Sequence, residues 1–380
     1  LFQAEAGIRD PESCLVGSEM CIRDRIDSEI YIFGLAGGVI TYRAEAVDNF
    51  ADGITLWTGF GDDFIEIDGT HYRDMQDANG DQIRTVTTLN TGLGDDHITV
   101  NLDDVAGAES ASTLADGYFV LNTQGPYNDF LTTVAQGLAI NATIPTTDMD
   151  TVMGAGSTLP LIVFGGQDDD YIETGTDRDI VFGDRGRVHY YDEQGNLVAV
   201  RGNGGPGDFT DGVVRDVGRI FTVDSLIGGD DEIYTNEHDD IVFGGINGDT
   251  IDAGEGNNIV LGDSGYVDYI IDEAIPDTTD IDRIWSTDPD HGGNDNITTG
   301  DGDDIVLGGE DGEFVFTHDD LVISVANSGR SVEAAINTHG VEGDIIDAGH
   351  GDNLVFGDNG QITAAEADTV NFGMHPITLG

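Results

Sequence analysis

A nine-residue repeat is the feature that most constrains how this chain can fold. Residues 226–261 divide into four consecutive nonapeptides, LIGGDDEIY, TNEHDDIVF, GGINGDTID and AGEGNNIVL. Every unit has an apolar residue at the same position and a carboxylate or carboxamide two places before it. The apolar residues are Ile233, Val242, Ile251 and Val260, and the polar residues are Asp231, Asp240, Asp249 and Asn258. A single unit cannot bury its apolar side chain or hold a cation with one carboxylate. Units stacked in register do both, so the repeat predicts a solenoid.

A second copy of this block is interrupted. Residues 290–298 and 299–307 match the first two nonapeptides, and residues 339–347 and 348–356 match the last two. Between them, roughly residues 310–338 form an excursion whose alternating pattern predicts strands, or a strand and a short helix. We therefore expect the solenoid to leave its path at this excursion and to re-enter it within one turn.

The remaining sequence contains related elements. A third roll begins at residues 165–182, and isolated units stand at residues 58–66 and 91–99. A Gly-Asp-x-Gly tetrapeptide closes each block, at residues 183–186, 262–265 and 357–360. Alternating stretches at 187–200 and 266–275 follow the first two tetrapeptides, and the first stretch predicts a β-hairpin around residues 193–196. Short rolls with hairpin-like insertions are therefore expected throughout.

These patterns divide the chain into five segments. Residues 14–25, CLVGSEMCIRDR, resemble a translated sequencing adapter, so residues 1–25 are interpreted as non-native and left out of the fold prediction. The other segments are a degenerate β-rich region, a short roll with a hairpin, a roll block with an insertion, and a roll block with the excursion at 310–338. Their bounds are 26–150, 151–225, 226–289 and 290–380.

The period resembles the Gly-Gly-x-Gly-x-Asp-x-U-x repeat of RTX, or haemolysin-type, calcium-binding proteins, in which U is apolar. The resemblance implies an all-β fold made of parallel β-roll or β-solenoid blocks, interrupted by hairpin-like insertions. It also implies that two nonapeptides make one coil, so that turns on the same edge are 18 residues apart. On this sequence the implied pairs are Asp231 with Asp249, Asp240 with Asn258, Asp295 with Asp344, and Asp304 with Asn353.

Calcium is the cofactor that these ladders suit. The ion takes six to eight oxygen ligands, which include carboxylates and backbone carbonyls, and glycine turns bring carbonyl oxygens close without a Cβ in the way. The resemblance implies ligands in two strong blocks and a weaker pair at Asp170 and Asp179, which have no carboxylate 18 residues onward. The candidate ligands are Asp231, Asp240, Asp249, Asn258, Asp295, Asp304, Asp344, Asn353, Asp170 and Asp179, with turn glycines Gly229, Gly256, Gly293, Gly302 and Gly351. The alternative is that the aspartates only cap turns through backbone hydrogen bonds.

Departures from the consensus qualify this ligand set. Asn258 and Asn353 replace aspartate in the last unit of each block, which lowers the charge of the ligands there. His238 and Asn247 stand where the consensus has glycine. Asp63 and Asp96 belong to isolated units, so the weakest sites are expected before residue 100.

Charge excludes several classes of function. The chain of 380 residues has 74 acidic and 14 basic residues, a net charge of -60, and no lysine. A phosphate-binding loop of the Walker type and a Schiff-base lysine are therefore excluded, and nucleic acid and anionic membranes are repelled. A salt-adapted surface explains part of this charge, but not its nine-residue period. The longest apolar run, Leu159–Phe164, is far shorter than the roughly 20 residues of a membrane span.

Two motifs that look functional have simpler interpretations. Gly262-Asp-Ser-Gly265 resembles a serine-protease nucleophile segment, but Ser264 aligns with Arg185 and Asn359 in the other tetrapeptides. Residues 77–81 resemble the start of an EF-hand loop, but Gln82 replaces its glycine, and a hairpin turn fits better. No His-Glu-x-x-His motif is present. The sequence predicts no enzyme activity.

The function expected from these features is that of a calcium-binding segment of a large secreted or cell-surface RTX-like protein. It would fold on binding calcium and act as a stiff spacer or display scaffold outside the cell. One alternative is the non-catalytic tail of a secreted hydrolase or toxin. Another is an adhesin whose insertions, at 187–225, 266–289 and 310–338, bind cell-surface or glycan ligands.

Overall fold

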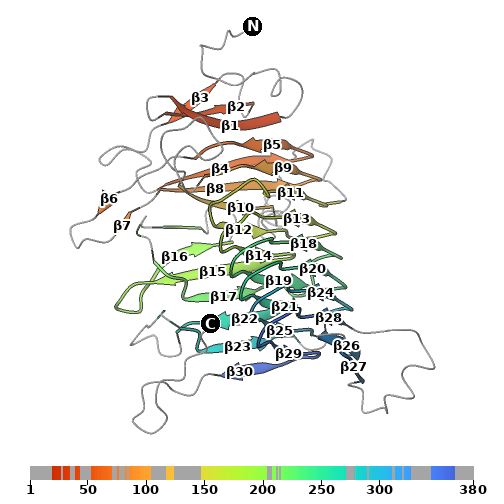
Figure 1. Cartoon of the computed structure of the whole chain (residues 1–380). Coiled ribbons are helices and arrows are strands. Elements are labelled where there is room, and N and C mark those ends of the chain that lie inside the picture. The colour runs from red at the N-terminus through yellow and green to blue at the C-terminus, as the bar shows by residue number, and fades with distance from the viewer. Residues whose placement is uncertain are drawn as a thin grey trace.

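Two long β-sheets face each other and make a solenoid (Figure 1). The computed structural model describes residues 19–26, 29–34, 39–42, 53–70, 75–76, 82–83, 85–103, 117–123, 147–202, 208–210, 213, 215–270, 278, 280–288, 291–309, 313–318, 321–326 and 344–363. Within these ranges the regular elements are strands, which confirms the all-β prediction. No helix in this part of the chain is long and apolar enough to cross a membrane.

Sheet A has thirteen strands, of which eight form its parallel centre. The central strands are β5 (Phe64–Ile67), β9 (His97–Val100), β11 (Thr151–Met153), β13 (Tyr171–Glu173), β18 (Glu232–Tyr234), β20 (Thr250–Asp252), β24 (Asn296–Thr298) and β28 (Ile345–Asp347). At the amino-terminal end the sheet continues through β1 (Glu19–Ile26), β2 (Glu29–Phe33) and β3 (Ile40–Tyr42). Strand β1 therefore includes residues of the segment that resembles an adapter.

Sheet B has nine strands, and all of their pairings are parallel. Its strands are β4 (Gly53–Phe60), β8 (Val86–Leu93), β10 (Tyr118–Asn122), β12 (Leu161–Phe164), β14 (Ile180–Phe182), β19 (Ile241–Gly245), β21 (Ile259–Asp263), β25 (Ile305–Leu307) and β29 (Leu354–Phe356). The chain alternates between the two sheets, so one strand of each makes a coil.

The core between the sheets is the apolar ladder expected from the repeat. Ile233 pairs with Ile251, and Val242 pairs with Val260, in the predicted 18-residue register. Ile297 pairs with Ile346 across the excursion, as predicted. These side chains are at most 1% exposed. Short strands of three residues suffice because each inward side chain stacks on an identical or similar one in the next coil.

The excursion forms a hairpin rather than the strand and helix that the sequence left open. Strands β26 (Glu313–His318) and β27 (Leu321–Ala326) pair antiparallel, and β26 pairs in parallel with β28. The hairpin extends the carboxy-terminal end of sheet A (Figure 1). The rest of residues 310–338 lies outside the described part of the chain.

The other insertions form a six-stranded antiparallel sheet, here named the side sheet, beside sheet B (Figure 1). Its strands are β16 (Leu197–Arg201), β15 (Gly186–Tyr191), β17 (Arg219–Thr222), β22 (Gly265–Asp268), β23 (Arg283–Ser286) and β30 (Gln361–Thr363). Strands β15 and β16 form the hairpin predicted around residues 193–196. Val188, Ile220 and Val267 of the side sheet pack against the phenylalanines on the outer face of sheet B.

The loop at residues 77–81 lies between two short antiparallel strands, β6 (Met75–Gln76) and β7 (Gln82–Ile83). Met75 pairs with Ile83, and Gln76 pairs with Gln82. This pairing confirms the hairpin interpretation over an EF-hand loop. The residues of the loop itself lie outside the described ranges.

Candidate calcium sites along two aspartate ladders

One ladder of aspartates lies where the chain turns into sheet A. Its members precede consecutive central strands of sheet A: Asp63, Asp96, Asp150, Asp170, Asp231, Asp249, Asp295 and Asp344. The backbone N–H of each residue donates to Oδ1 of the next, at distances of 2.7 to 2.9 Å. We call this the sheet A ladder. It links every coil from β5 to β28.

A second ladder, the sheet B ladder, lies where the chain turns into sheet B. Its members are Asp179, Asp240, Asn258, Asp304 and Asn353. Their backbone N–H groups donate to Oδ1 of the next member at 2.7 to 2.9 Å. The structure thus brings the ten carboxylate and carboxamide candidates predicted from the sequence into these two ladders. Their role as metal ligands stays a prediction.

The ladders are more continuous than the 18-residue spacing predicts. Asp170 meets Asp231, and Asp179 meets Asp240, each 61 residues onward, because the hairpin β15–β16 and strand β17 are looped out between them. Asp249 likewise meets Asp295, which is 46 residues away. The sequence analysis looked for a partner only at the family spacing in this region, and it therefore treated Asp170 and Asp179 as weakly supported.

The second carboxylate oxygen of the sheet A ladder lacks a protein partner at the centre of the molecule. Oδ2 of Asp170, Asp231, Asp249 and Asp295 is buried and accepts no hydrogen bond from the described residues. A buried carboxylate oxygen without a partner is unfavourable by about 1–3 kcal/mol or more. Turn capping alone therefore accounts for Oδ1 of these residues but not for Oδ2.

Each of these Oδ2 atoms lies beside a glycine and a carbonyl oxygen of the next coil. A Cβ built on Gly183 would lie 2.1 Å from Oδ2 of Asp231 and 2.6 Å from the carbonyl oxygen of Gly244. A Cβ on Gly244 would lie 2.2 Å from Oδ2 of Asp249 and 2.1 Å from the carbonyl oxygen of Gly262. The same arrangement recurs at Gly165 with Asp170 and at Gly262 with Asp295. The space that the missing side chain leaves is thus bounded by two oxygens.

These four cradles have the oxygen chemistry of a hard cation. Calcium combines carboxylates with backbone carbonyls, as the cradles do. Among the described residues no three acidic, histidine or cysteine side chains converge on one point. A cation here would therefore depend on carbonyl oxygens and on carboxylates from neighbouring coils rather than on a compact cluster of side chains.

The electrostatics of the cation-free ladders also favour a positive ion. Burial raises the pKa of Asp231 to about 8 and that of Asp240 to about 9, and the charge of Asp179 also raises the latter. Burial and neighbouring carboxylates raise the pKa of Asp170, Asp249 and Asp295 well above the ordinary value. Stacked carboxylates in this chain therefore need protons or cations to neutralise them.

The turn glycines keep neighbouring coils close. A Cβ on Gly256 would lie 2.1 Å from the carbonyl oxygen of His238, and one on Gly293 would lie 2.0 Å from that of Asn247. Similar contacts with the preceding coil occur at Gly229, Gly302 and Gly351. His238 and Asn247, which stand at consensus glycine positions, have φ values of 80° and 72°. They adopt the left-handed backbone that glycine adopts more easily.

The asparagines of the sheet B ladder use both ends of their amides. Oδ1 of Asn258 accepts from the N–H of Asp240, and Nδ2 donates to the carbonyl oxygens of Gly254 and Gly256 at 3.3 and 3.4 Å. Nδ2 of Asn353 donates in the same way to the carbonyl oxygen of Ala348. An N–H group cannot ligate a cation. In these two coils the amide group occupies the place of the second carboxylate oxygen.

Sequence reasoning missed the role of the aspartates in the Gly-Asp-x-Gly tetrapeptides. Asp184 accepts from the backbone N–H groups of Gly229 and Ile246, and Asp263 accepts from that of Gly293. These residues hold the next turn in place, as the capping alternative describes. Their recurrence in each tetrapeptide was the available signal. Ser264, in the same motif, is 2% exposed, which leaves its hydroxyl little access to a substrate.

Comparison with known proteins supports this interpretation. The family model of the RTX calcium-binding nonapeptide repeat matches the chain in four copies, at residues 162–187, 228–250, 248–266 and 291–312. No curated protein and no solved structure matches the chain. The four copies contain the central part of both ladders, and RTX nonapeptide repeats bind calcium ions. The chain therefore contains a region of RTX calcium-binding nonapeptide repeats folded as a parallel β-solenoid.

Proposed function

We propose that this chain is a calcium-dependent structural segment of a secreted or cell-surface protein, which folds on binding calcium and then acts as a stiff spacer and display scaffold. The observation that carries the proposal is the row of cradles at Gly165, Gly183, Gly244 and Gly262. Each combines a buried carboxylate oxygen that lacks a hydrogen bond with a carbonyl oxygen of the next coil. We assign no catalytic role to these ladders.

Calcium binding would be coupled to folding because the ligands come from different coils. Asp231 and Asp249 approach each other only when the coils have stacked. Without cations, the stacked carboxylates repel one another, and the narrow core of short strands offsets little of the lost chain entropy. Extracellular calcium modules bind at about 10⁻⁴–10⁻³ M. A chain with sites of this class would remain unfolded at cytosolic calcium levels and would fold outside the cell.

The continuity of the two sheets supports the role of a spacer. Neighbouring coils are joined by strand pairing in both sheets and by the two ladders. The side sheet and the excursion hairpin project from this framework without interrupting it (Figure 1). The side sheet is also the observation that favours the adhesin alternative, because residues 187–225 and 266–289 contribute strands to a common surface.

The test is far-ultraviolet circular dichroism of the full chain during a calcium titration from excess EDTA to millimolar calcium. We expect a β-sheet signal that develops with calcium and disappears on renewed chelation. Magnesium at the same concentration should induce much less structure, because it demands octahedral geometry and releases its water reluctantly. An equal β-sheet signal in EDTA and in calcium would reject coupled folding.

A further inference from the structure

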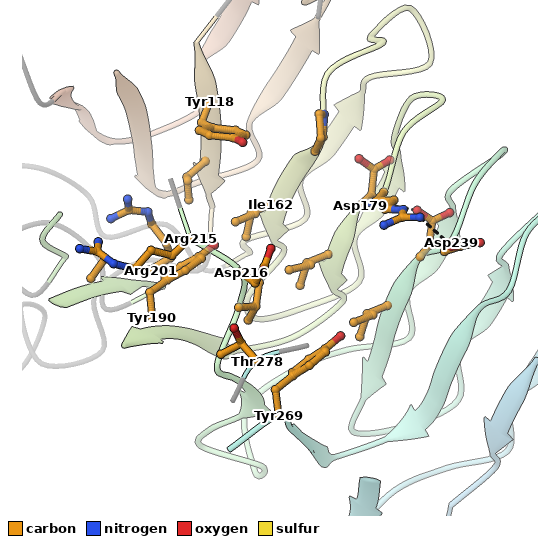
Figure 2. A pocket seen from close by; sticks show the side chains of 18 of the residues that line it. Tyr118, Ile162, Asp179, Tyr190, Arg201, Arg215, Asp216, Asp239, Tyr269 and Thr278 are labelled. Carbon is orange, nitrogen blue, oxygen red and sulfur yellow. Dashed lines mark hydrogen bonds and ion pairs between the residues drawn. The ribbon is translucent and has the colours of Figure 1, made fainter. Parts of the chain in front are cut away.

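A cavity of about 720 Å³ lies between the outer face of sheet B and the side sheet (Figure 2). Neither the repeat pattern nor calcium binding accounts for it. Its volume lies in the range of sites for small molecules, about 300–1,000 Å³. Strands of sheet B form one side of it, and strand β16 with the segments around residues 215 and 280 forms the other.

The floor of the cavity is a row of isoleucines. Ile162, Ile180, Ile241 and Ile259 line the cavity and pair in register along β12, β14, β19 and β21. They are outward-facing residues of sheet B, since the side chains that follow them in each strand point into the core. The floor is therefore a flat apolar surface made by four successive coils.

The side sheet covers only one of the two outward rows of sheet B. The other row, Phe164, Phe182 and Phe243, is completely buried and stacks with ring centroids 4.9 to 5.0 Å apart. Gly186 of the side sheet approaches the ring of Phe182 so closely that a Cβ there would lie 2.3 Å from it. The sequence thus pairs a filled phenylalanine row with an isoleucine row that borders the cavity.

The walls carry hydroxyl groups and positive charge. Figure 2 shows Tyr118, Tyr190 and Tyr269 around the isoleucine floor. Burial raises the pKa of Tyr190 and Tyr269 to about 12, so both hydroxyls remain donors at neutral pH. Three of the 14 arginines in this strongly acidic chain, Arg178, Arg201 and Arg215, line the same cavity.

The charges differ between the two sides of the cavity (Figure 2). Arg201 and Arg215 lie together on the side of Tyr190, whereas Asp179 and Asp239 lie on the opposite side. On that acidic side Arg178 is paired with Asp239 at 3.2 Å. Arg201 is held in place by hydrogen bonds from its guanidinium to the carbonyl oxygens of Val200 and Phe209 and lies over the ring of Tyr190.

We propose that this cavity binds a small amphipathic anion, whose apolar body rests on the isoleucine floor and whose acidic head group contacts Arg201 and Arg215. The head group lies on that side because the aspartates opposite would repel it. The apolar body replaces water on a surface that no other part of the described chain covers. The proposal concerns the outer face of sheet B and does not depend on which coils hold calcium.

The test uses two fluorescent probes in saturating calcium: 8-anilinonaphthalene-1-sulfonate and N-phenyl-1-naphthylamine, which has the same ring system without the sulfonate. We expect the sulfonate to bind at one site per chain and more tightly than the neutral probe. Arg215→Gln should weaken the sulfonate about tenfold, the loss of one charge-assisted contact, and leave the neutral probe unchanged. Arg201→Gln is expected to have the same effect.

Two further variants fix the location. Ala199→Phe, which places a ring in the cavity from β16, should abolish binding of both probes. Arg178→Gln removes the same charge as Arg215→Gln on the opposite side, so it should change the affinity little. For each variant, an unchanged calcium midpoint by circular dichroism shows that the fold is intact.

Absence of saturable binding by the sulfonate would overturn the proposal. Sulfonate binding that survives Ala199→Phe would also overturn it, because that binding would lie elsewhere. Equal affinity for the two probes, or an equal loss with Arg178→Gln and Arg215→Gln, would reject the assigned head-group position.

Discussion

Each aspartate of the sheet A ladder has two separate tasks, one for each carboxylate oxygen. Oδ1 of Asp249 accepts the backbone N–H of Asp231, and Oδ2 borders the cradle at Gly244. The first task is structural, and an asparagine can perform it. The second requires an oxygen that can face a cation. Substitution by asparagine therefore separates turn formation from cation binding.

We expect Asp231→Asn to raise the calcium concentration at the folding midpoint, by about tenfold or more. The buried carboxylate is 1% exposed, and a contact with a charged group contributes about 1.5–3 kcal/mol. The matched control is Glu232→Gln, an exposed neighbour that loses the same charge. The calcium titration followed by circular dichroism measures both. Equal shifts in the two variants would mean that net charge, rather than the cradle, determines calcium affinity.

The cation-free chain should gain structure at lower pH. Raised folded-state pKa values mean that, between the ordinary value of 3.8 and the raised value, the folded state binds more protons than the unfolded state. Its stability therefore falls as pH rises, across a window that extends to about 8 for Asp231 and about 9 for Asp240.

We accordingly expect more β-sheet signal at pH 5 than at pH 8.5 in calcium-free buffer, and a much smaller difference in saturating calcium. Circular dichroism at the two pH values, with and without calcium, measures this. A calcium-free signal that is flat or that increases with pH would contradict the result, because it would mean that the ladders are not the groups that titrate.

At the scale of elements, the side sheet stabilises the solenoid by covering the phenylalanine row. Phe182 is fully buried between Phe164 and Phe243, in rings stacked at 5.0 and 4.9 Å. This row lies outside the calcium turns. Its contribution to stability should therefore be independent of the ladders.

We expect Phe182→Ala to lower the free energy of unfolding by about 3–5 kcal/mol, the usual result of removing a buried aromatic ring. Urea unfolding in excess calcium measures this. The control is Phe209→Ala, which removes a ring that is 46% exposed and should have a small effect. Similar losses in the two variants would show that the side sheet does not depend on the phenylalanine row.

At the scale of the whole molecule, the ladders join the roll blocks that the sequence separates. The chain has two tryptophans, Trp57 in β4 near one end and Trp285 in the side sheet nearer the other. If calcium folds one continuous solenoid, the fluorescence of Trp57→Phe and of Trp285→Phe should give the same calcium midpoint. Midpoints that differ by about tenfold would instead indicate blocks that fold independently.

The sequence predicts this fold well where the physical constraint is local. The pairing of Ile297 with Ile346 followed from one apolar position per nonapeptide, because only stacking buries such a residue. The partnership of Asp170 with Asp231 could not be predicted in the same way. It depends on where the chain returns after 61 residues, and the sequence of the insertion contains no marker of that point. The side sheet and its cavity arise from pairing between insertions, which no repeat period encodes.

The hydrogen bond between rungs has the same length whatever lies between them. It is 2.8 Å both for Asp231 and Asp249, 18 residues apart, and for Asp170 and Asp231, 61 residues apart. Closing a loop costs only about 0.6 kcal/mol for each doubling of its length, so the longer connection is less favourable by about 1 kcal/mol. A single well-made rung contact offsets that difference. The turns of this solenoid can therefore accept passenger segments of very different lengths, which makes them natural points of insertion for new domains.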